Sequence, residues 1–457
     1  GVYLFGVERV VQNVLPEGDY GLYFSLLGLG MLLQVVADFG LQLHNSRNLA
    51  GHRHLLAKYF PYFIGLKLIL GSAFFLLLLL VGLGLGYRGA EIYLLAIAGA
   101  VQFFNSMVLY LRSNLSGLGR YALDGWFSIC DKTLMILGVG GLLLFAPEEL
   151  TIYRFAGLQL LSWGLTALLL LLALGSRLPR KLPRFQRATF GVLLKGGAPF
   201  ALAVFLATAY TKTDAVMIER LLADGAAAAD HYAAGYRLLD ALNVFGWLLA
   251  GLLIPMYARL YVQKESLLPL LKFSTQLLLA GALCAAIPLA YFAEEVTQLL
   301  YAFADARTAQ ILCWLALTFI AQCLNYAYGA LLSATGFIGR MNKIYALGIL
   351  LNLVGNWLVI PTYGAPGAAA MTLLTQGFVA VVQAVLAYRW LALPKGTIAW
   401  GRILLLGLIL GTCGRALLNF GWPAGLLLGI GGLGLAILLK LVDLRQLRHL
   451  GADAGAR

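Results

Sequence analysis

Eight charged side chains lie inside long apolar runs of this chain, where a charge is energetically costly. Four are basic and four are acidic: Lys67, Lys132, Lys212, Arg237, Asp38, Asp131, Asp214 and Asp240. A charge at the centre of a bilayer costs about 2.5–3.5 kcal/mol, so each should face protein or water. Lysine offers a point charge and arginine a two-pronged donor, so the basic residues are candidates for binding an anion.

The runs that carry these charges are long enough to cross a membrane. Most of the thirteen segments reach the roughly 20 residues that a hydrocarbon core of about 30 Å requires. Only helices and closed barrels satisfy their backbone in lipid, and continuous apolar runs of this length are typical of helices. The segments are 20–41, 59–87, 90–111, 125–146, 155–174, 196–218, 232–258, 267–293, 308–335, 341–360, 366–388, 403–414 with its flanks, and 423–439.

The gaps between the segments alternate in charge. Those on one side hold 23 Lys/Arg and four Asp/Glu, whereas those on the other hold six Lys/Arg and 12 Asp/Glu. Because Lys and Arg are enriched in cytoplasmic loops, the basic gaps are predicted to be cytoplasmic. Residues 1–14 behave as the outer end of one more helix. We therefore expect an all-α polytopic protein of the bacterial inner membrane, with about 14 helices, the first one truncated, and both termini in the cytoplasm.

Composition excludes several classes of protein. A chain that is 61% hydrophobic and 12% charged, with a mean hydropathy of +0.85, does not fit a soluble multidomain protein. The net charge of +13 is explained by cytoplasmic loops rather than by nucleic acid. The five cysteines lack metal-binding spacing, and no phosphate-binding loop follows a strand, so neither a metal nor another cofactor is expected. No gap is long enough for a catalytic domain, which argues against an enzyme.

Two halves of the chain share a weak internal repeat. Residues 8–23 resemble 219–236, and 115–120 resemble 332–340, and each pair lies on the same predicted side of the membrane. Such parallel repeats can expose a central site alternately to the two sides. The predicted division is an N-terminal lobe 1–174 (helices 1–6), a basic linker 175–195, a C-terminal lobe 196–391 (helices 7–12), and an extra helix pair with a tail at 392–457.

Depth along the helices groups four of the charges near the outer side. Asp214 lies about four residues inside its helix and Arg237 about five inside the next, so their levels match within a turn. Asp240 shares the face of Arg237, three residues away. Lys212 lies about one turn deeper.

The other four charges lie nearer the cytoplasmic side. Lys67 is about nine residues inside its helix, and Asp131 and Lys132 are about seven or eight inside theirs. Asp38 lies close to its helix end, which is consistent with an interfacial position. Because basic and acidic residues are equal in number, internal salt bridges between helices are an alternative to a binding role for all eight.

Several motifs resemble the Wzx-type polysaccharide flippases of the multidrug/oligosaccharidyl-lipid/polysaccharide exporter superfamily. The resemblance extends over nearly the whole chain and rests on Gly18–Tyr23, Ala37–Leu41, Asp214, Gly235–Leu238, Pro255–Arg259, Asn352 and Leu358–Ala369. It implies two six-helix lobes and a C-terminal helix pair. It also implies transfer of an undecaprenyl-diphosphate-linked oligosaccharide, such as an O-antigen unit, between membrane leaflets. Membrane lipid, a polysaccharide polymerase and glycosyltransferases are then the expected partners.

On this resemblance, the basic residues inside the helices become candidates for holding the diphosphate. Lys67 and Lys132 would receive it from the inner leaflet, and Lys212 and Arg237 would hold it nearer the outer leaflet. Asp131, Asp214 and Asp240 would then serve as charge partners or carry a proton or sodium ion.

Two other functions remain open. A cation-coupled multidrug exporter of the same fold would require an acidic cavity, whereas half of the charges inside the helices are basic. A membrane-embedded polysaccharide polymerase would require a large periplasmic loop, and no gap is long enough to supply one.

Overall fold

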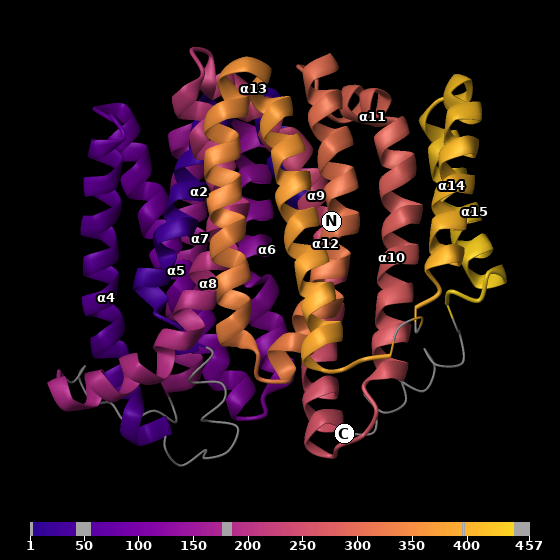
Figure 1. Cartoon of the computed structure of the whole chain (residues 1–457). Coiled ribbons are helices and arrows are strands. Elements are labelled where there is room, and N and C mark those ends of the chain that lie inside the picture. Colours follow the sequence, from indigo (N-terminus) through magenta and orange to yellow (C-terminus); the bar gives the residue numbers. More distant parts are fainter. Residues whose placement is uncertain (1–2, 43–55, 176–184, 395, 397, 443–457) are drawn as a thin grey trace. The chain divides into compact units, whose positions relative to one another are not determined.

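The computed structural model describes residues 3–42, 56–175, 185–394, 396 and 398–442. Every regular element within these ranges is a helix (Figure 1). The helices form two compact units, unit 1 (Gly1–Asp230) and unit 2 (His231–Arg457), which are treated separately below. The prediction of an all-α fold is therefore confirmed.

Unit 1 is a bundle of long helices, most of them joined by short turns, so that the helices on either side of such a turn run in opposite directions. Its core lies where α2 packs against α4, α5 and α8, and where α5 and α6 pack against α7. The helices are η1 (Leu4–Glu8), α1 (Arg9–Val14), α2 (Asp19–Asp38), α4 (Leu56–Gly84), α5 (Ala90–Gly117), α6 (Tyr121–Phe145), η3 (Pro147–Glu149), α7 (Ile152–Gly175), α8 (Arg187–Leu221) and the start of α9 (Gly225–Val262). We call the end with turns at 85–89 and 146–151 the acidic end, and the end with the turn at 118–120 the basic end.

The start of α2 is fixed by two glycines and a buried carboxylate. Gly18 adopts φ 90°, a left-handed conformation that favours glycine. Its N–H donates to Oδ2 of Asp230 at 2.7 Å. A Cβ on Gly21 would lie 2.1 Å from the carbonyl oxygen of Ala226, so only glycine permits this close approach of α2 to α9. The run Gly18–Gly21 thus joins two helices of unit 1.

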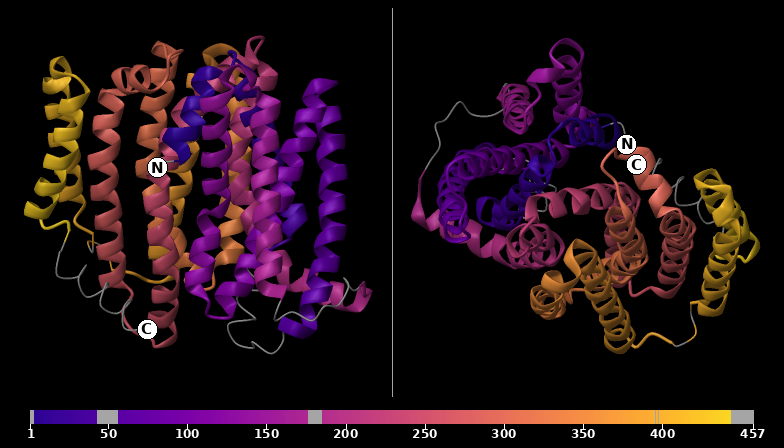
Figure 2. Two further views of the ribbon diagram at one scale, coloured as in Figure 1. Left: turned by 180° about the vertical axis from the view of Figure 1, so that it is seen from behind. Right: turned by 90° about the horizontal axis from the view of Figure 1, so that it is seen from above.

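Within the described residues, unit 2 contains the rest of α9, six further α-helices and one short 3₁₀-helix. α12 packs against α10 and α13, and α14 and α15 lie side by side along α10, as the view down the helices shows (Figure 2). The helices are α10 (Leu268–Tyr291), α11 (Ala293–Leu300), α12 (Ala306–Ala334), α13 (Ile338–Trp390), α14 (Trp400–Leu417), η4 (Leu418–Phe420) and α15 (Trp422–Leu438). Here the acidic end carries the turn at 301–305 and the basic end carries the turns at 263–267 and 335–337.

α13 is two membrane-length segments joined by a sharp bend. Gly364 has φ 62° and ψ −152°, outside the helical range, and it lies between Pro361 and Pro366. Proline cannot donate to the helical ladder, and glycine accepts the left-handed φ, so this sequence reverses the chain. The bend falls between the predicted segments 341–360 and 366–388.

Ten helices are long and apolar enough to cross a membrane, among the described residues. That number treats the bent α13 as one and omits the shorter apolar helix α15. The protein is therefore multi-pass, and the figure of about 14 spans is approximate.

The lobe boundaries at 174, 195 and 391 remain a prediction. The two compact units divide inside α9, at Asp230 and His231. α8, which the sequence assigns to the C-terminal lobe, packs against α2 in unit 1. Residues 176–184 of the predicted linker and 443–457 of the tail lie outside the described residues.

Candidate functional site

Lys67 of α4 is buried in unit 1 with all its donors in use. Its side chain is 1% exposed, and Nζ lies 2.7 Å from Oδ1 of Asp38. Nζ also donates to Oγ of Ser106 at 2.7 Å and to its carbonyl oxygen at 3.1 Å. The ring of Tyr110 lies 5.6 Å from Nζ. An ammonium has three donors, so the ion pair and the two hydrogen bonds satisfy it within the protein.

The rings around this pair hold the helices together. Tyr110 stacks on Phe63 at 5.5 Å and on Phe60 at 6.2 Å between ring centroids. These residues belong to one apolar cluster with Leu66 and Leu111. The buried charge pair is therefore enclosed by packed side chains, and Asp38 anchors the end of α2 to α4.

Lys132 of α6 has a more accessible position. Its side chain is 46% exposed, and Nζ lies 3.1 Å from Oδ2 of its neighbour Asp131, which is buried. The ring of Trp163 lies 5.8 Å from Nζ. The Lys132 side chain is more exposed than those of Lys67 and Arg237, which are 1% and 13% exposed.

Lys212 and Asp214 lie where α8 packs against α2. Asp214 is buried, and Ser25 of α2 donates to the carbonyl oxygen of the next residue, Ala215, at 2.8 Å. A Cβ on Gly28 would lie 3.2 Å from the carbonyl oxygen of Lys212. The two helices are thus in close contact at the level of these charges, and both residues take part in further interactions within the protein.

In unit 2, polar side chains from three helices lie close together. Nη1 of Arg237 lies 3.6 Å from Oδ2 of Asp240, one turn along α9. The hydroxyl of Tyr326 on α12 donates to Oδ1 of Asn243 at 3.3 Å. Beside Tyr326, Asn325 donates to Oε1 of Gln376 on α13 at 2.8 Å. The predicted pairing of Arg237 with Asp240 is present.

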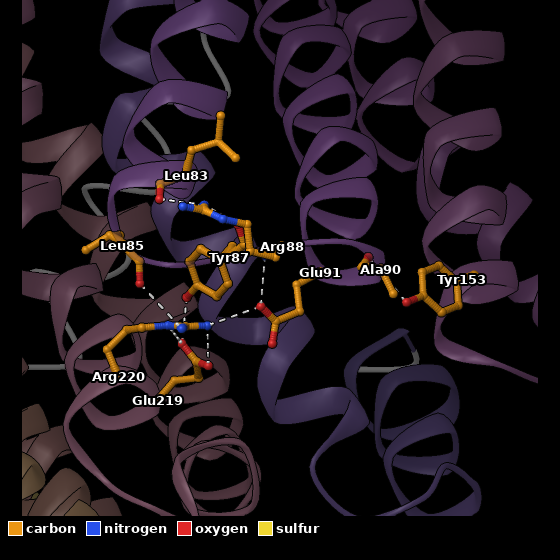
Figure 3. Close-up of polar contacts among 9 residues, drawn as sticks. All are labelled: Leu83, Leu85, Tyr87, Arg88, Ala90, Glu91, Tyr153, Glu219 and Arg220. Atoms are coloured by element: carbon orange, nitrogen blue, oxygen red, sulfur yellow. Dashed lines mark hydrogen bonds and ion pairs between the residues drawn. The ribbon is translucent and has the colours of Figure 1, made fainter.

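A second charged cluster lies at the acidic end of unit 1 (Figure 3). The guanidinium of Arg220 lies 3.6 Å from the ring centroid of Tyr87. Arg220 donates to Glu219 at 2.7 Å and lies 3.7 Å from Glu91. The hydroxyl of Tyr87 donates to Glu219 at 2.6 Å. Burial, followed by this hydrogen bond to a carboxylate, raises the pKa of Tyr87.

Sequence reasoning found some of these arrangements and missed others. Lys67, Lys132 and Arg237 each lie beside a carboxylate, at Asp38, Asp131 and Asp240. The sequence did not link Asp38 to Lys67, because its position near a helix end suggested an interface. It did not link Tyr87 to Arg220, because no local pattern joins residues so far apart. Asp214 and Arg237 belong to different units, so their predicted grouping remains a prediction.

Comparison with known proteins identifies a family whose model matches this chain. The family described as polysaccharide biosynthesis protein matches residues 5–261, more than half of the chain. No curated protein sequence matches the chain.

Solved structures share the fold at low sequence identity. A lipid II flippase, MurJ, in an inward closed conformation aligns with a TM-score of 0.73 and 15% identity over 97% of each chain. An inward-facing multidrug resistance MATE family transporter aligns at 0.65 and 12% identity, over 85% of this chain and 94% of that one. The MATE transporter VcmN of Vibrio cholerae aligns at 0.58 and 18%, over 86% and 95%. The chain thus has the fold of MurJ and of these MATE transporters.

Proposed function

Because the chain belongs to the polysaccharide biosynthesis protein family, we propose that it moves a lipid-linked oligosaccharide across the bacterial cytoplasmic membrane. The family and the fold indicate a multi-pass transporter rather than a catalytic enzyme. The proposed cargo is an undecaprenyl-diphosphate-linked oligosaccharide unit, taken from the cytoplasmic to the outer leaflet by alternating access. Glycosyltransferases would build this cargo, and a polysaccharide polymerase would consume it.

The family match carries this proposal, and the charges inside the helices support it. Lys67, Lys132, Lys212 and Arg237 are fixed cations inside a membrane protein, and a diphosphate is the polyanion that every such cargo carries. Three of the four lie beside a carboxylate within the described residues. Exchanging a carboxylate for a phosphate oxygen keeps each cation paired, so no buried cation loses its partner when the diphosphate binds.

The difference in exposure between Lys132 and Lys67 suggests the order in which they bind the diphosphate. Lys132 is 46% exposed and shares its charge with Asp131, whereas Lys67 is enclosed with Asp38 and Ser106. In the proposed cycle, Lys132 meets the diphosphate first. Lys67 exchanges Asp38 for phosphate oxygen only when the helices of unit 1 move. Asp131, Asp214 and Asp240 neutralise the cations when no cargo is bound, and Asp214 and Asp240 are the candidates for coupling to a proton or sodium ion.

A transport assay tests the proposal directly. The full chain is reconstituted in vesicles that contain undecaprenyl-diphosphate-linked oligosaccharide extracted from the strain that carries the gene. Transfer between leaflets is followed by access of an added glycosidase to the sugar. The protein should speed this transfer, and Lys132→Ala should slow it about tenfold, the effect of losing one hydrogen bond to a charged group. Lys132→Arg, which keeps the charge, is the matched control and should retain most of the rate.

The same vesicles separate the proposed function from drug export. If the protein leaves the oligosaccharide in its original leaflet but drives a proton-dependent efflux of ethidium, the multidrug exporter of the same fold is the correct assignment. In cells without their own flippase, the active protein should restore surface polysaccharide.

A further inference from the structure

One face of α9 in unit 2 combines polar side chains with a large exposed tryptophan. Asp240, Asn243 and Trp247 are spaced by three and four residues, so at 100° per residue they lie within about 60° of one another. Trp247 is 69% exposed. The exposed apolar residues Phe245 and Leu248 lie on another side of the same helix, and the exposed Val244 lies between the two sides.

The polar neighbours indicate what Trp247 faces. Asp240 lies 3.6 Å from Arg237, and Asn243 accepts from the hydroxyl of Tyr326 at 3.3 Å. A carboxylate and an amide are costly in hydrocarbon, so this side of α9 should be turned towards protein or water rather than lipid. Trp247 follows Asn243 by one turn and shares that side.

The depth of Trp247 also sets it apart from the usual membrane tryptophans. Tryptophan is enriched at the two membrane–water interfaces. Trp247 precedes Arg259, the basic residue near the end of α9, by twelve positions, or about 18 Å of helix. An interfacial role therefore does not account for this residue.

The amide beside Trp247 is held in one orientation. The Cβ that Gly246 lacks would lie 2.6 Å from the ring of Tyr326, so this glycine lets the ring lie against α9. The Tyr326 hydroxyl then donates a hydrogen bond to Oδ1 of Asn243. Within the described part of the chain, Nδ2 of Asn243 makes no hydrogen bond, so its two donors are available to a ligand oxygen.

We propose that Trp247 is the stacking platform for one sugar ring of the cargo, with Asn243 as a hydrogen-bond donor to that ring. A pyranose has an apolar face of C–H groups and an edge of hydroxyls. A flat indole fits the first and an amide four residues away, about 6 Å along the helix, fits the second. This inference rests on the proposed function, since it requires a cargo that contains sugar.

Unit 2 also supplies a matched control tryptophan. Trp357 of α13 is 64% exposed, close to the value for Trp247. Its neighbours on the same face, Leu350 and Val354, are exposed and apolar, whereas Asn352 and Asn356 are buried on another side of the helix. Trp357 therefore has the surroundings of a lipid-facing residue.

Binding to two lipids tests the platform. The full-length protein in nanodiscs is titrated with undecaprenyl diphosphate and, separately, with the same lipid carrying the oligosaccharide. Trp247→Leu should weaken binding of the sugar-bearing lipid about tenfold, to the level of the bare lipid, because the stacking and apolar contact with one ring are lost. Binding of the bare lipid should be unchanged. Trp247→Phe should keep most of the affinity, and Trp357→Leu should change neither titration.

The possible results separate the two proposals. If the unsubstituted protein binds neither lipid, the proposed function fails. If it binds both lipids equally, or if Trp247→Leu leaves binding of the sugar-bearing lipid unchanged, the platform is wrong and the proposed function stands. A Trp247→Leu protein that loses both lipids also contradicts the platform, because the loss does not depend on sugar. Asn243→Leu provides a second test and should weaken binding of the sugar-bearing lipid alone.

Discussion

At the level of single residues, Lys67 has two possible roles that experiment can separate. Its ammonium is enclosed with Asp38 and Ser106, so it stabilises unit 1 whether or not it ever binds cargo. Removing one partner of a buried ion pair leaves an uncompensated charge, whereas replacing both with apolar groups is often neutral. Loss of transport in a Lys67 variant alone therefore would not identify a binding residue.

We expect Lys67→Met to lower the free energy of unfolding by about 3 kcal/mol, because the Asp38 carboxylate loses its partner. The double variant Lys67→Met, Asp38→Leu should recover most of that loss, as measured by denaturant unfolding in detergent. If Lys67 also holds the diphosphate, the double variant should be stable and still transport poorly. A stable double variant with full transport would limit Lys67 to a structural role.

The tertiary surroundings explain why the sequence identified these charges but not all their partners. Costly charges inside apolar runs are visible without a structure, which is how Lys67, Lys132 and Arg237 were found. Their partners depend on how helices pack. Asp38 lies 29 residues from Lys67, and it reaches the ammonium only because α2 packs against α4. The same limit applies to Asn243 and Tyr326, which are joined by the packing of separate helices.

At the level of helices, their ends are defined by specific polar contacts. α12 begins with a capping box, in which Asp305 accepts from the N–H of Thr308 at 2.9 Å and the Thr308 hydroxyl lies 3.3 Å from the N–H of Asp305. Nδ1 of His231 lies 3.6 Å from the same carboxylate. Burial raises the pKa of Asp305, but the Thr308 hydrogen bond and the charge of His231 outweigh it, and the pKa is lowered overall.

This lowered pKa gives the direction of a pH effect. A carboxylate whose pKa is lower in the folded state stabilises the protein above its unfolded value of about 3.9, and this contribution is lost as the pH falls through the folded value. We expect Asp305→Ala to lower the free energy of unfolding at neutral pH by about 1 kcal/mol, the usual effect of losing an N-cap. Asp305→Asn should keep the helix cap but lose the part of the unfolding free energy that depends on pH in the acid range. Equal acid sensitivity of unfolding in the Asn variant and the unsubstituted protein would contradict this assignment.

The turn between α4 and α5 is attached to α8 by a planar guanidinium. Arg220 lies flat on Tyr87 and donates to Glu219, a geometry that a lysine ammonium does not reproduce. We expect Arg220→Lys to lower the free energy of unfolding by about 1–2 kcal/mol, through loss of the cation–π contact and of paired donors. Arg88→Lys is the control: the residue is exposed, and a lysine keeps a donor for the carbonyl oxygens of Leu83 and Tyr87, so the effect should be below about 0.5 kcal/mol. Thermal unfolding of the two variants in the same detergent measures both changes in stability. An equal loss of stability in the two variants would contradict a specific role for Arg220.

At the level of the whole molecule, the length and spacing of the apolar runs predicted the all-α fold. The segments 341–360 and 366–388 flank the bend at Gly364, and segment 403–414 with its flanks became α14, Trp400–Leu417. Boundaries were less accurate where an apolar run continues past its helix. The segment 59–87 ends within the turn, because α4 stops at Gly84 and Tyr87 folds back to meet Glu219. An apolar run shows which residues can lie in lipid, but the residue at which the helix ends depends on polar contacts that the run does not reveal.

The orientation of the chain in the membrane is the prediction that every proposed step depends on. Two positions near helix ends suit a labelling test: Glu148 at the acidic end of unit 1 is exposed, and a Cβ on Gly339 at the start of α13, at the basic end of unit 2, meets nothing within 4 Å. In a chain whose five native cysteines have been replaced by serine or alanine, Glu148→Cys should react in intact cells with a maleimide that cannot cross the membrane. Gly339→Cys should react only after the cells are permeabilised, because basic loops stay in the cytoplasm. The reverse pattern would place the cations at the opposite depths, and Lys132 would then meet cargo from the outer leaflet instead of the inner one.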